Sequence, residues 1–188
     1  MTPGRILLTQ EQIRARVREL GGSITRHYRG RRPIFLGVMN GALFFLADLL
    51  RAVDLDDTEI SCVGLASYAG TKSTGKLRGL DALGKSFRGR HVLIVDDIFD
   101  TGRTLSALAA RLKKLGAAEV KICVLLEKRR RHEVAVKPEW VGFKIADEFV
   151  VGYGLDYEGR YRGLRQVRVL DPKGKIYRQL TPDGELPP

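Results

Sequence analysis

Residues 91–115 read HVLIVDDIFDTGRTLSALAARLKKL, and this stretch decides the fold. It begins with an apolar run of strand length, passes through a polar turn at 96–102 and continues as a helical pattern from 104 to 115, which Gly116 closes. A second apolar run, at 120–126, predicts another buried strand. Strand, crossover helix and strand form the βαβ unit of a parallel sheet.

The flanking segments extend this pattern and predict an α/β protein with a parallel sheet and helices on both of its faces. We expect residues 1–188 to form a single domain, as their number suggests. From Trp140 onward, short strands and turns predict a small subregion over one edge of the sheet. The other predicted elements are a first helix that a capping box opens at 9–12 and that runs to Tyr28, a strand at 34–38, a helix at 42–53 and a strand at 59–66.

The charge is strongly positive, with 33 Lys and Arg against 22 Asp and Glu, a net +11 and a pI near 9.9. This excess favours an anionic partner, either a nucleic acid or a small ligand rich in phosphate, although a solvated basic surface would give the same count. A helix-turn-helix signal and an RNA-binding aromatic pattern are both missing, so nucleic acid is the less favoured partner. The apolar runs are too short for a signal peptide or a membrane span, so we expect a cytoplasmic protein without a membrane partner.

The cysteines and histidines do not indicate a metal centre. Cys62 and Cys123 both lie in apolar stretches and are expected to be buried thiols, too few for a disulfide framework or a four-ligand zinc site. The three histidines, His27, His91 and His132, are predicted to be scattered over the surface and strand ends, which supports neither a metal site nor a catalytic triad.

Two short motifs resemble well-known sites without matching them. Residues 70–76 nearly form a Walker A loop, but Leu77 stands where the magnesium-binding hydroxyl is needed, and their composition is more typical of a mobile flap. The triplet 100–102, Asp-Thr-Gly, also occurs in aspartic proteases, but there it works in two copies and it is present here once.

The turn after the strand at 91–95 is suited to an anion. It opens a helix, whose first backbone N–H groups favour phosphate, while Thr101 and Thr104 add hydroxyl donors and Gly102 permits close approach. The adjacent carboxylates of Asp96 and Asp97 would repel a phosphate, so they are expected to face sugar hydroxyls or magnesium.

The residues around this turn show a family resemblance. The stretch 92–105, VLIVDDIFDTGRTL, resembles the phosphoribosyl pyrophosphate (PRPP) motif of type I phosphoribosyltransferases. Further matches, running from about Gly37 to Val169, are similar to the hypoxanthine-guanine phosphoribosyltransferases. They comprise Ser67-Tyr68, Leu126-Glu127-Lys128-Arg129, Val141-Gly142-Phe143, the stretch 149–157 (FVVGYGLDY) and Arg162.

The resemblance implies transfer of the 5-phosphoribosyl group from PRPP to hypoxanthine or guanine, giving IMP or GMP and pyrophosphate in purine salvage, with Mg²⁺ and in a homo-oligomer, a dimer or tetramer. It also implies roles for residues. Asp100 would be the general base for the purine N7 proton, and the loop Asp100, Thr101, Gly102, Arg103 and Thr104 would hold the 5′-phosphate of PRPP. Asp96 and Asp97 would bind the ribose hydroxyls directly or through magnesium. The purine would be bound by Lys128, Phe149, Val150 and Asp156, and Asp156 would also help to bind a second magnesium on pyrophosphate. The pyrophosphate itself would be bound by Met39, Asn40, Gly41 and Arg162, and the flap would begin at Ser67 and Tyr68.

Two residues depart from the family pattern. Asn40 stands where many members have Lys in the pyrophosphate turn, which removes a positive charge beside the leaving group. Asp96 is one methylene shorter than the usual Glu, so its contact with ribose is expected to pass through water or metal. Two alternatives stay open at this point: a regulator of the same fold that binds RNA or DNA, and a phosphoribosyltransferase for another base.

Overall fold

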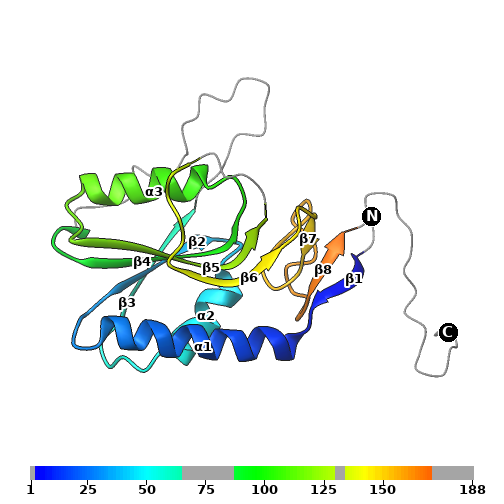
Figure 1. Ribbon diagram of the computed structural model, residues 1–188, viewed down its shortest axis with the longest axis horizontal. Coiled ribbons are helices and arrows are strands. Elements are labelled where there is room, and N and C mark those ends of the chain that lie inside the picture. Colours follow the sequence, from blue (N-terminus) through cyan, green and yellow to red (C-terminus); the bar gives the residue numbers. More distant parts are fainter. Residues whose placement is uncertain (1–2, 65–86, 130–133, 171–188) are drawn as a thin grey trace, which may run out of the picture.

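The computed structural model describes residues 3–64, 87–129 and 134–170. Its main sheet has five parallel strands in the order β3-β2-β4-β5-β6 (Figure 1). The predicted α/β class with a parallel sheet is therefore confirmed. The flap residues Ser67 and Tyr68 and the near-Walker stretch 70–76 lie outside the described residues. The strands are β2 (Ile34–Met39), β3 (Glu59–Gly64), β4 (His91–Phe99), β5 (Glu119–Lys128) and β6 (Trp140–Ile145).

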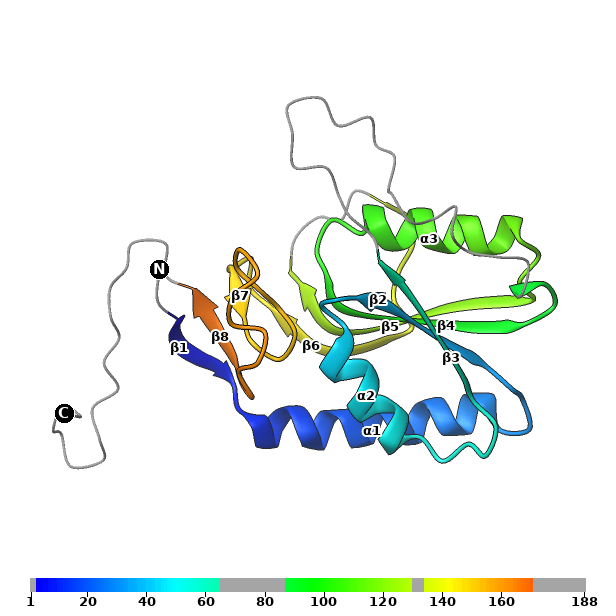
Figure 2. The ribbon, with the colours of Figure 1, turned by 180° about the vertical axis from the view of Figure 1, so that it is seen from behind.

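Helices cover both faces of this sheet, as the sequence predicted. Helices α1 (Gln10–Tyr28) and α2 (Leu43–Ala52) lie on one face and α3 (Arg103–Lys114) lies on the other (Figures 1 and 2). The capping box is present, because Thr9 Oγ1 accepts a hydrogen bond from the Gln12 backbone N–H and Gln12 Oε1 accepts one from the Thr9 N–H.

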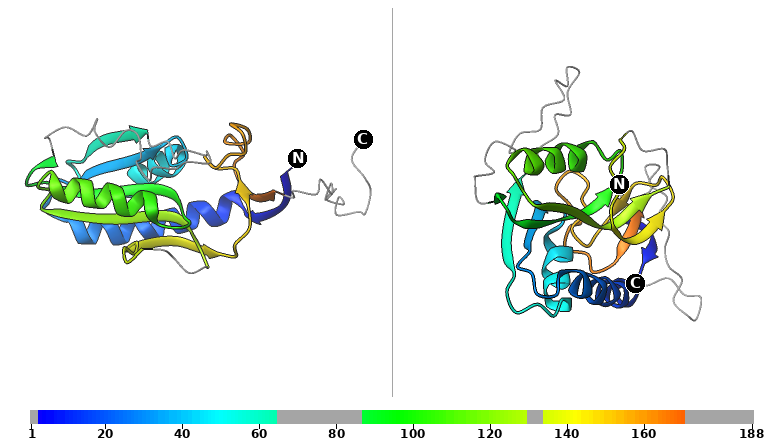
Figure 3. Two further views of the ribbon diagram at one scale, coloured as in Figure 1. Left: turned by 90° about the horizontal axis from the view of Figure 1, so that it is seen from above. Right: turned by 60° about the vertical axis from the view of Figure 1, so that its left-hand side comes forward.

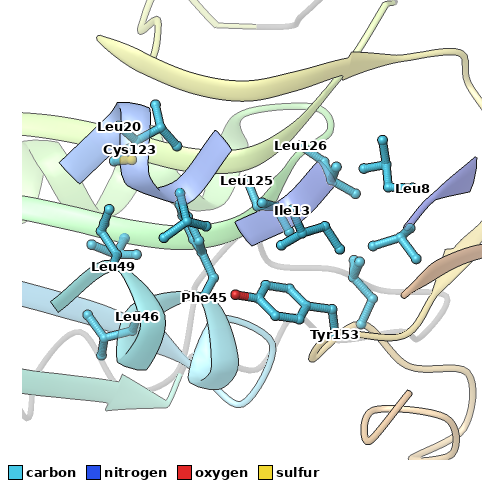
Figure 4. Close-up of a cluster of buried hydrophobic side chains, with 14 of the residues drawn as sticks. Leu8, Ile13, Leu20, Phe45, Leu46, Leu49, Cys123, Leu125, Leu126 and Tyr153 are labelled. Carbon is cyan, nitrogen blue, oxygen red and sulfur yellow. The ribbon is translucent and has the colours of Figure 1, made fainter. Parts of the chain in front are cut away.

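Two apolar cores hold the layers together, one on each face of the sheet. Along β2, Phe35 packs in the core with α1 and α2, whereas its neighbours Ile34 and Leu36 pack in the core with α3. This alternation follows from the two-residue repeat of a strand. Figure 4 shows the first core, in which Phe45 of α2 and Ile13 of α1 meet above the sheet.

A second, smaller sheet stands beyond the carboxyl ends of the main strands (Figures 1 and 3). Its antiparallel strands β1 (Pro3–Leu8), β7 (Val150–Val151) and β8 (Val167–Leu170) pair in the order β1-β8-β7. Two expectations need correction. The first element is strand β1 and not the helix, since Ile6-Leu7-Leu8 has a distant partner in β8. Trp140 belongs to β6 of the main sheet, so the subregion starts later than predicted.

One of the two cysteine predictions is wrong. Cys123 is buried as expected, but Cys62 is exposed. It lies on β3, the edge strand of the main sheet, where the neighbouring Ile60 is also 57% exposed. The helices on that side leave this part of the edge strand uncovered, a feature that strand length and hydropathy do not encode.

His91 begins β4 and so lies at a strand end, as predicted, but His91 and His27 are not scattered, because both lie beside one carboxylate. His27 Nε2 lies 3.2 Å from Glu119 Oε2, and His91 Nδ1 lies 3.5 Å from the same oxygen. Burial tends to raise the pKa of Glu119, but the hydrogen bond and charge of His27 outweigh it and the pKa is lowered. This cluster joins the first residues of β4 and β5 to α1, and His132 lies outside the described residues.

None of the helices within 3–64, 87–129 and 134–170 is long and apolar enough to cross a membrane.

Candidate functional site

The carboxyl end of β4 carries the acidic residues. The strand continues through Asp96 and Asp97 to Phe99, and the turn is confined to 100–102, whereas the sequence predicted a strand that ended at Val95. The strand is longer because β5 stays paired with it along this stretch, and because Phe99, 1% exposed, packs in the core under α3. The acid pair is therefore held on a rigid strand and not on a loop.

Of the two adjacent carboxylates, Asp96 is buried and Asp97 is half-buried. Asp96 is 7% exposed, and its Oδ1 accepts a hydrogen bond of 3.0 Å from the Asp97 backbone N–H. Burial, followed by the negative charge of Asp97, raises the pKa of Asp96 well above its usual value. Burial also raises the pKa of Asp97, while hydrogen bonding to Asp96 and the charge of Arg162 hold part of that rise back. The pair is thus poised to accept a hydroxyl donor or a cation.

The turn that follows β2 lies directly against this pair. A Cβ atom added to Gly41 would stand 2.0 Å from Asp97 Oδ2, so only glycine allows this approach. Asn40, in the same turn, is exposed. The structure thus brings the predicted pyrophosphate turn, Met39-Asn40-Gly41, to the predicted ribose-binding acids.

The turn after β4 opens α3 in the way that anion binding requires. Gly102 has φ of +81° and is the N-cap of α3, and no side-chain hydrogen bond caps that end of the helix. Thr101 Oγ1 accepts a 3.4 Å hydrogen bond from the Arg103 N–H, and Thr104 lies in the first turn of the helix. The first backbone N–H groups of α3 and the positive end of its dipole are therefore both directed to the space in front of the turn 100–102.

Lys128 ends β5 beside this turn. Its side chain is 13% exposed, and its Nζ lies 3.0 Å from Asp147 Oδ1 and 3.9 Å from Asp100 Oδ1. The structure therefore brings together Lys128 and Asp100, which are 28 positions apart in the sequence. Asp147 was missed by the sequence reasoning, although it stands only two residues before the predicted purine-stacking residue Phe149.

Phe149 is accessible to a ligand. It is 51% exposed, and its ring meets Tyr157 edge-on with centroids 5.8 Å apart. Its carbonyl oxygen accepts a 2.8 Å hydrogen bond from the Leu170 N–H, which fixes the backbone at the start of β7. Val150, the next residue, is buried in β7. An exposed large aromatic ring on a fixed backbone suits a stacking platform better than a core position.

Asp156 and Arg162 form a pair of their own. Arg162 Nη2 lies 2.7 Å from Asp156 Oδ1, and Arg162 Nη1 donates a 2.6 Å hydrogen bond to the Gly154 carbonyl oxygen. Within the described residues, no group of three His, Cys, Asp or Glu side chains is arranged to hold a metal ion. The predicted metal ligands Asp96, Asp97 and Asp156 therefore do not form one preassembled cluster.

The burial of Asp96 has a cost that mutation should reveal. We expect Asp96→Asn to raise the free energy of unfolding by about 1–3 kcal/mol at pH 7.5, since the amide keeps the acceptor for the Asp97 N–H and carries no charge to desolvate. A carboxyl whose pKa is raised on folding destabilises the native state as pH rises above its unfolded value of 3.8, so the gain should shrink toward pH 4. Urea unfolding at both pH values measures this, and a less stable variant at pH 7.5 would contradict it.

Comparison with known proteins agrees with this geometry. The family model of the phosphoribosyl transferase domain matches residues 5–158. The hypoxanthine-guanine phosphoribosyltransferase of Lactococcus lactis is 42% identical over 170 residues, which are 90% of this chain and 92% of that protein. The bifunctional protein TilS/HprT of Listeria innocua is 41% identical over 170 residues, and the chain spans only 26% of its length.

A solved structure extends the likeness to three dimensions. The crystal structure of a hypoxanthine phosphoribosyltransferase from Staphylococcus aureus has a TM-score of 0.85 and 37% identity, covering 91% of this chain and 93% of that chain. The matched residues 5–158 include the acid pair, the turn and Lys128, which the structure brings together at one edge of the sheet. The chain therefore belongs to the phosphoribosyl transferase family and, within it, to the hypoxanthine-guanine phosphoribosyltransferases.

Proposed function

We propose that this protein transfers the 5-phosphoribosyl group of PRPP to a 6-oxopurine, hypoxanthine or guanine, and releases pyrophosphate. The observation that carries the proposal is the placement of the Asp100 carboxylate 3.9 Å from the Lys128 ammonium, beside a helix start suited to phosphate. Proteins related to this chain that are named hypoxanthine-guanine phosphoribosyltransferases support it.

The acid and the amine match one edge of a 6-oxopurine. N7 and O6 of such a ring lie side by side on the same edge. Asp100 accepts the N7 proton as the purine attacks the anomeric carbon, and Lys128 donates a hydrogen bond to O6. Phe149 stacks on the ring, and the Val150 backbone contacts its other edge. Asp147, 3.0 Å from the Lys128 Nζ, holds that amine in position.

The 5′-phosphate and the pyrophosphate of PRPP bind at two different parts of the site. The 5′-phosphate binds at the start of α3, where the turn 100–104 presents N–H groups and threonine hydroxyls. The pyrophosphate binds beside the turn Met39-Asn40-Gly41, and Arg162 neutralises the charge that grows on it when the bond to C1 breaks. Because Asn40 is uncharged, Arg162 carries more of this neutralisation than it would beside a lysine.

The donor set fits magnesium. Mg²⁺ takes oxygen ligands, commonly one or two carboxylates together with substrate phosphates and water. Asp96 and Asp97 supply two adjacent carboxylates whose pKa values are raised chiefly by burial, and Asp156 supplies another beside Arg162. When bound, the ion would add charge stabilisation for the leaving pyrophosphate.

A direct assay tests the proposal. Hypoxanthine, guanine and xanthine are each incubated with PRPP and Mg²⁺, and the nucleoside monophosphate and pyrophosphate are measured. We expect turnover with hypoxanthine or guanine and equimolar products. Folded protein that turns over none of the three bases would overturn the proposal. Tight and steeply salt-dependent binding to a defined nucleic acid, without transfer, would instead support a regulator of the same fold.

A further inference from the structure

A cavity of about 400 Å³ lies away from the proposed reaction centre, between α1, α2 and the segment 153–165. Its volume falls within the range of about 300–1,000 Å³ that is usual for small-molecule sites. None of the residues assigned above to PRPP, purine or magnesium lines it. Figure 4 shows the Tyr153 ring beside Ile13 of α1, and both residues line the cavity.

The cavity is strongly basic. Four arginines and one acidic residue line it, a balance of 4 − 1 = +3. The acid, Asp48, is already engaged, because its Oδ2 accepts a 2.6 Å hydrogen bond from the Tyr153 hydroxyl and its Oδ1 lies 3.7 Å from Arg51 Nη1. Within the part of the chain that the structure describes, no carboxylate forms an ion pair with the other three. The four arginines are Arg14, Arg18, Arg51 and Arg165.

Such a set of guanidinium groups selects for phosphate. Arginine presents a rigid fork of N–H donors that matches the oxygens of a phosphoryl group. Arg14 and Arg18 are one helical turn apart on α1, so both extend from the same face toward the cavity. Arg165 approaches from the opposite segment. Unpaired arginines on facing walls are suited to a ligand with more than one phosphoryl group.

An aromatic surface adjoins these charges. Phe44, which is 40% exposed, and Tyr153 both line the cavity, with ring centroids 6.2 Å apart and planes inclined by 33°. The exposed ring of Phe44 offers a face on which a flat base can stack, and Tyr153, which is 7% exposed, supports it from within. From the cavity, its charge and this surface we propose that the protein has a second, non-catalytic binding site for a nucleoside di- or triphosphate.

The site is distinct from the catalytic edge but shares an element with it. Tyr153 stands between Gly152 and Gly154, and the Gly154 carbonyl oxygen accepts a hydrogen bond from Arg162. The segment that walls the cavity therefore also holds the residue assigned to pyrophosphate. Any test must keep the probe out of the catalytic edge, because that edge binds phosphates too.

The experiment is a calorimetric titration of the full chain with ATP, at physiological ionic strength and with GMP saturating the purine site. We expect one ATP to bind per chain. The double variant Arg14→Gln/Arg18→Gln should weaken ATP binding at least tenfold. The matched control Arg26→Gln/Arg29→Gln removes the same charge from exposed positions of α1 and its C-cap outside the cavity, and should change the affinity less than twofold.

Further titrations show which part of the nucleotide the cavity recognises. Phe44→Leu should weaken ATP more than inorganic triphosphate, because only ATP has a base to stack. Equal weakening in both double variants, or no ATP binding at millimolar concentration, would overturn the proposal. GMP binding is measured first. Its failure would count against the proposed transferase reaction, whereas the comparison of the two double variants would still decide the arginine cavity.

Discussion

Asp100→Asn is expected to lower kcat by about 10²-fold or more, since a positioned general base contributes roughly 10² to 10⁴ to the rate. This corresponds to at least about 2.7 kcal/mol of transition-state stabilisation. The amide keeps the size of the side chain and its place at the end of β4, but it cannot accept the N7 proton. PRPP binding should change little, because in the proposed site the turn 100–104 would hold the phosphate chiefly through backbone N–H groups and threonine hydroxyls.

Steady-state kinetics and PRPP titration together measure this outcome. A lowered kcat beside an unchanged affinity for PRPP is a signature that a merely structural role for Asp100 would not produce. Asp57→Asn is the matched control, because Asp57 is exposed and pairs with Arg32 far along the chain from the turn. A kcat within about threefold of the wild type for Asp100→Asn would show that another group takes the proton.

Local pattern predicted the central part of the fold well. The stretch 91–126 encodes its own strand, turn, helix and strand, because the contacts that define a βαβ unit lie close in sequence. The capping box at Thr9 is likewise a contact over three residues. For the same reason the acid pair and the turn 100–104, which are consecutive in sequence, were correctly expected at one edge of the sheet.

Local sequence patterns could not predict the contacts between segments that are distant in the sequence. Strand β1 exists because β8, more than 150 residues later, pairs with it. Cys62 is exposed because β3 takes the edge of the sheet, and strand order is a property of the whole chain. Asp147 reaches Lys128 only because β6 ends beside β5. The arginine cavity likewise left no sign in the sequence, since no spacing links Arg14 and Arg18 of α1 to Arg165.

Gly154 packs closely against Gly41 of the proposed pyrophosphate turn. Substitution of Gly154 is therefore expected to have the second large effect, a loss of stability. Gly154 has φ of +102°, and a Cβ atom at this position would stand 2.0 Å from the Gly41 carbonyl oxygen. Gly154→Ala must therefore strain its own backbone and displace the turn. We expect the free energy of unfolding to fall by about 3–5 kcal/mol, a large part of the 5–15 kcal/mol typical of a domain.

Gly159→Ala separates the two causes of this loss. Gly159 also has a positive φ, +76°, but no atom lies within 4 Å of its added Cβ, so it bears only the backbone strain of about 1 kcal/mol. Urea unfolding of both variants gives the difference, which measures the collision with Gly41. The Gly154 variant that remains folded should also bind PRPP more weakly, because the displaced turn carries the Gly41 contact with Asp97. If the two variants lost the same free energy of unfolding, the turn would move aside without an energetic penalty. Gly154 would then not be needed to keep the proposed pyrophosphate turn in place.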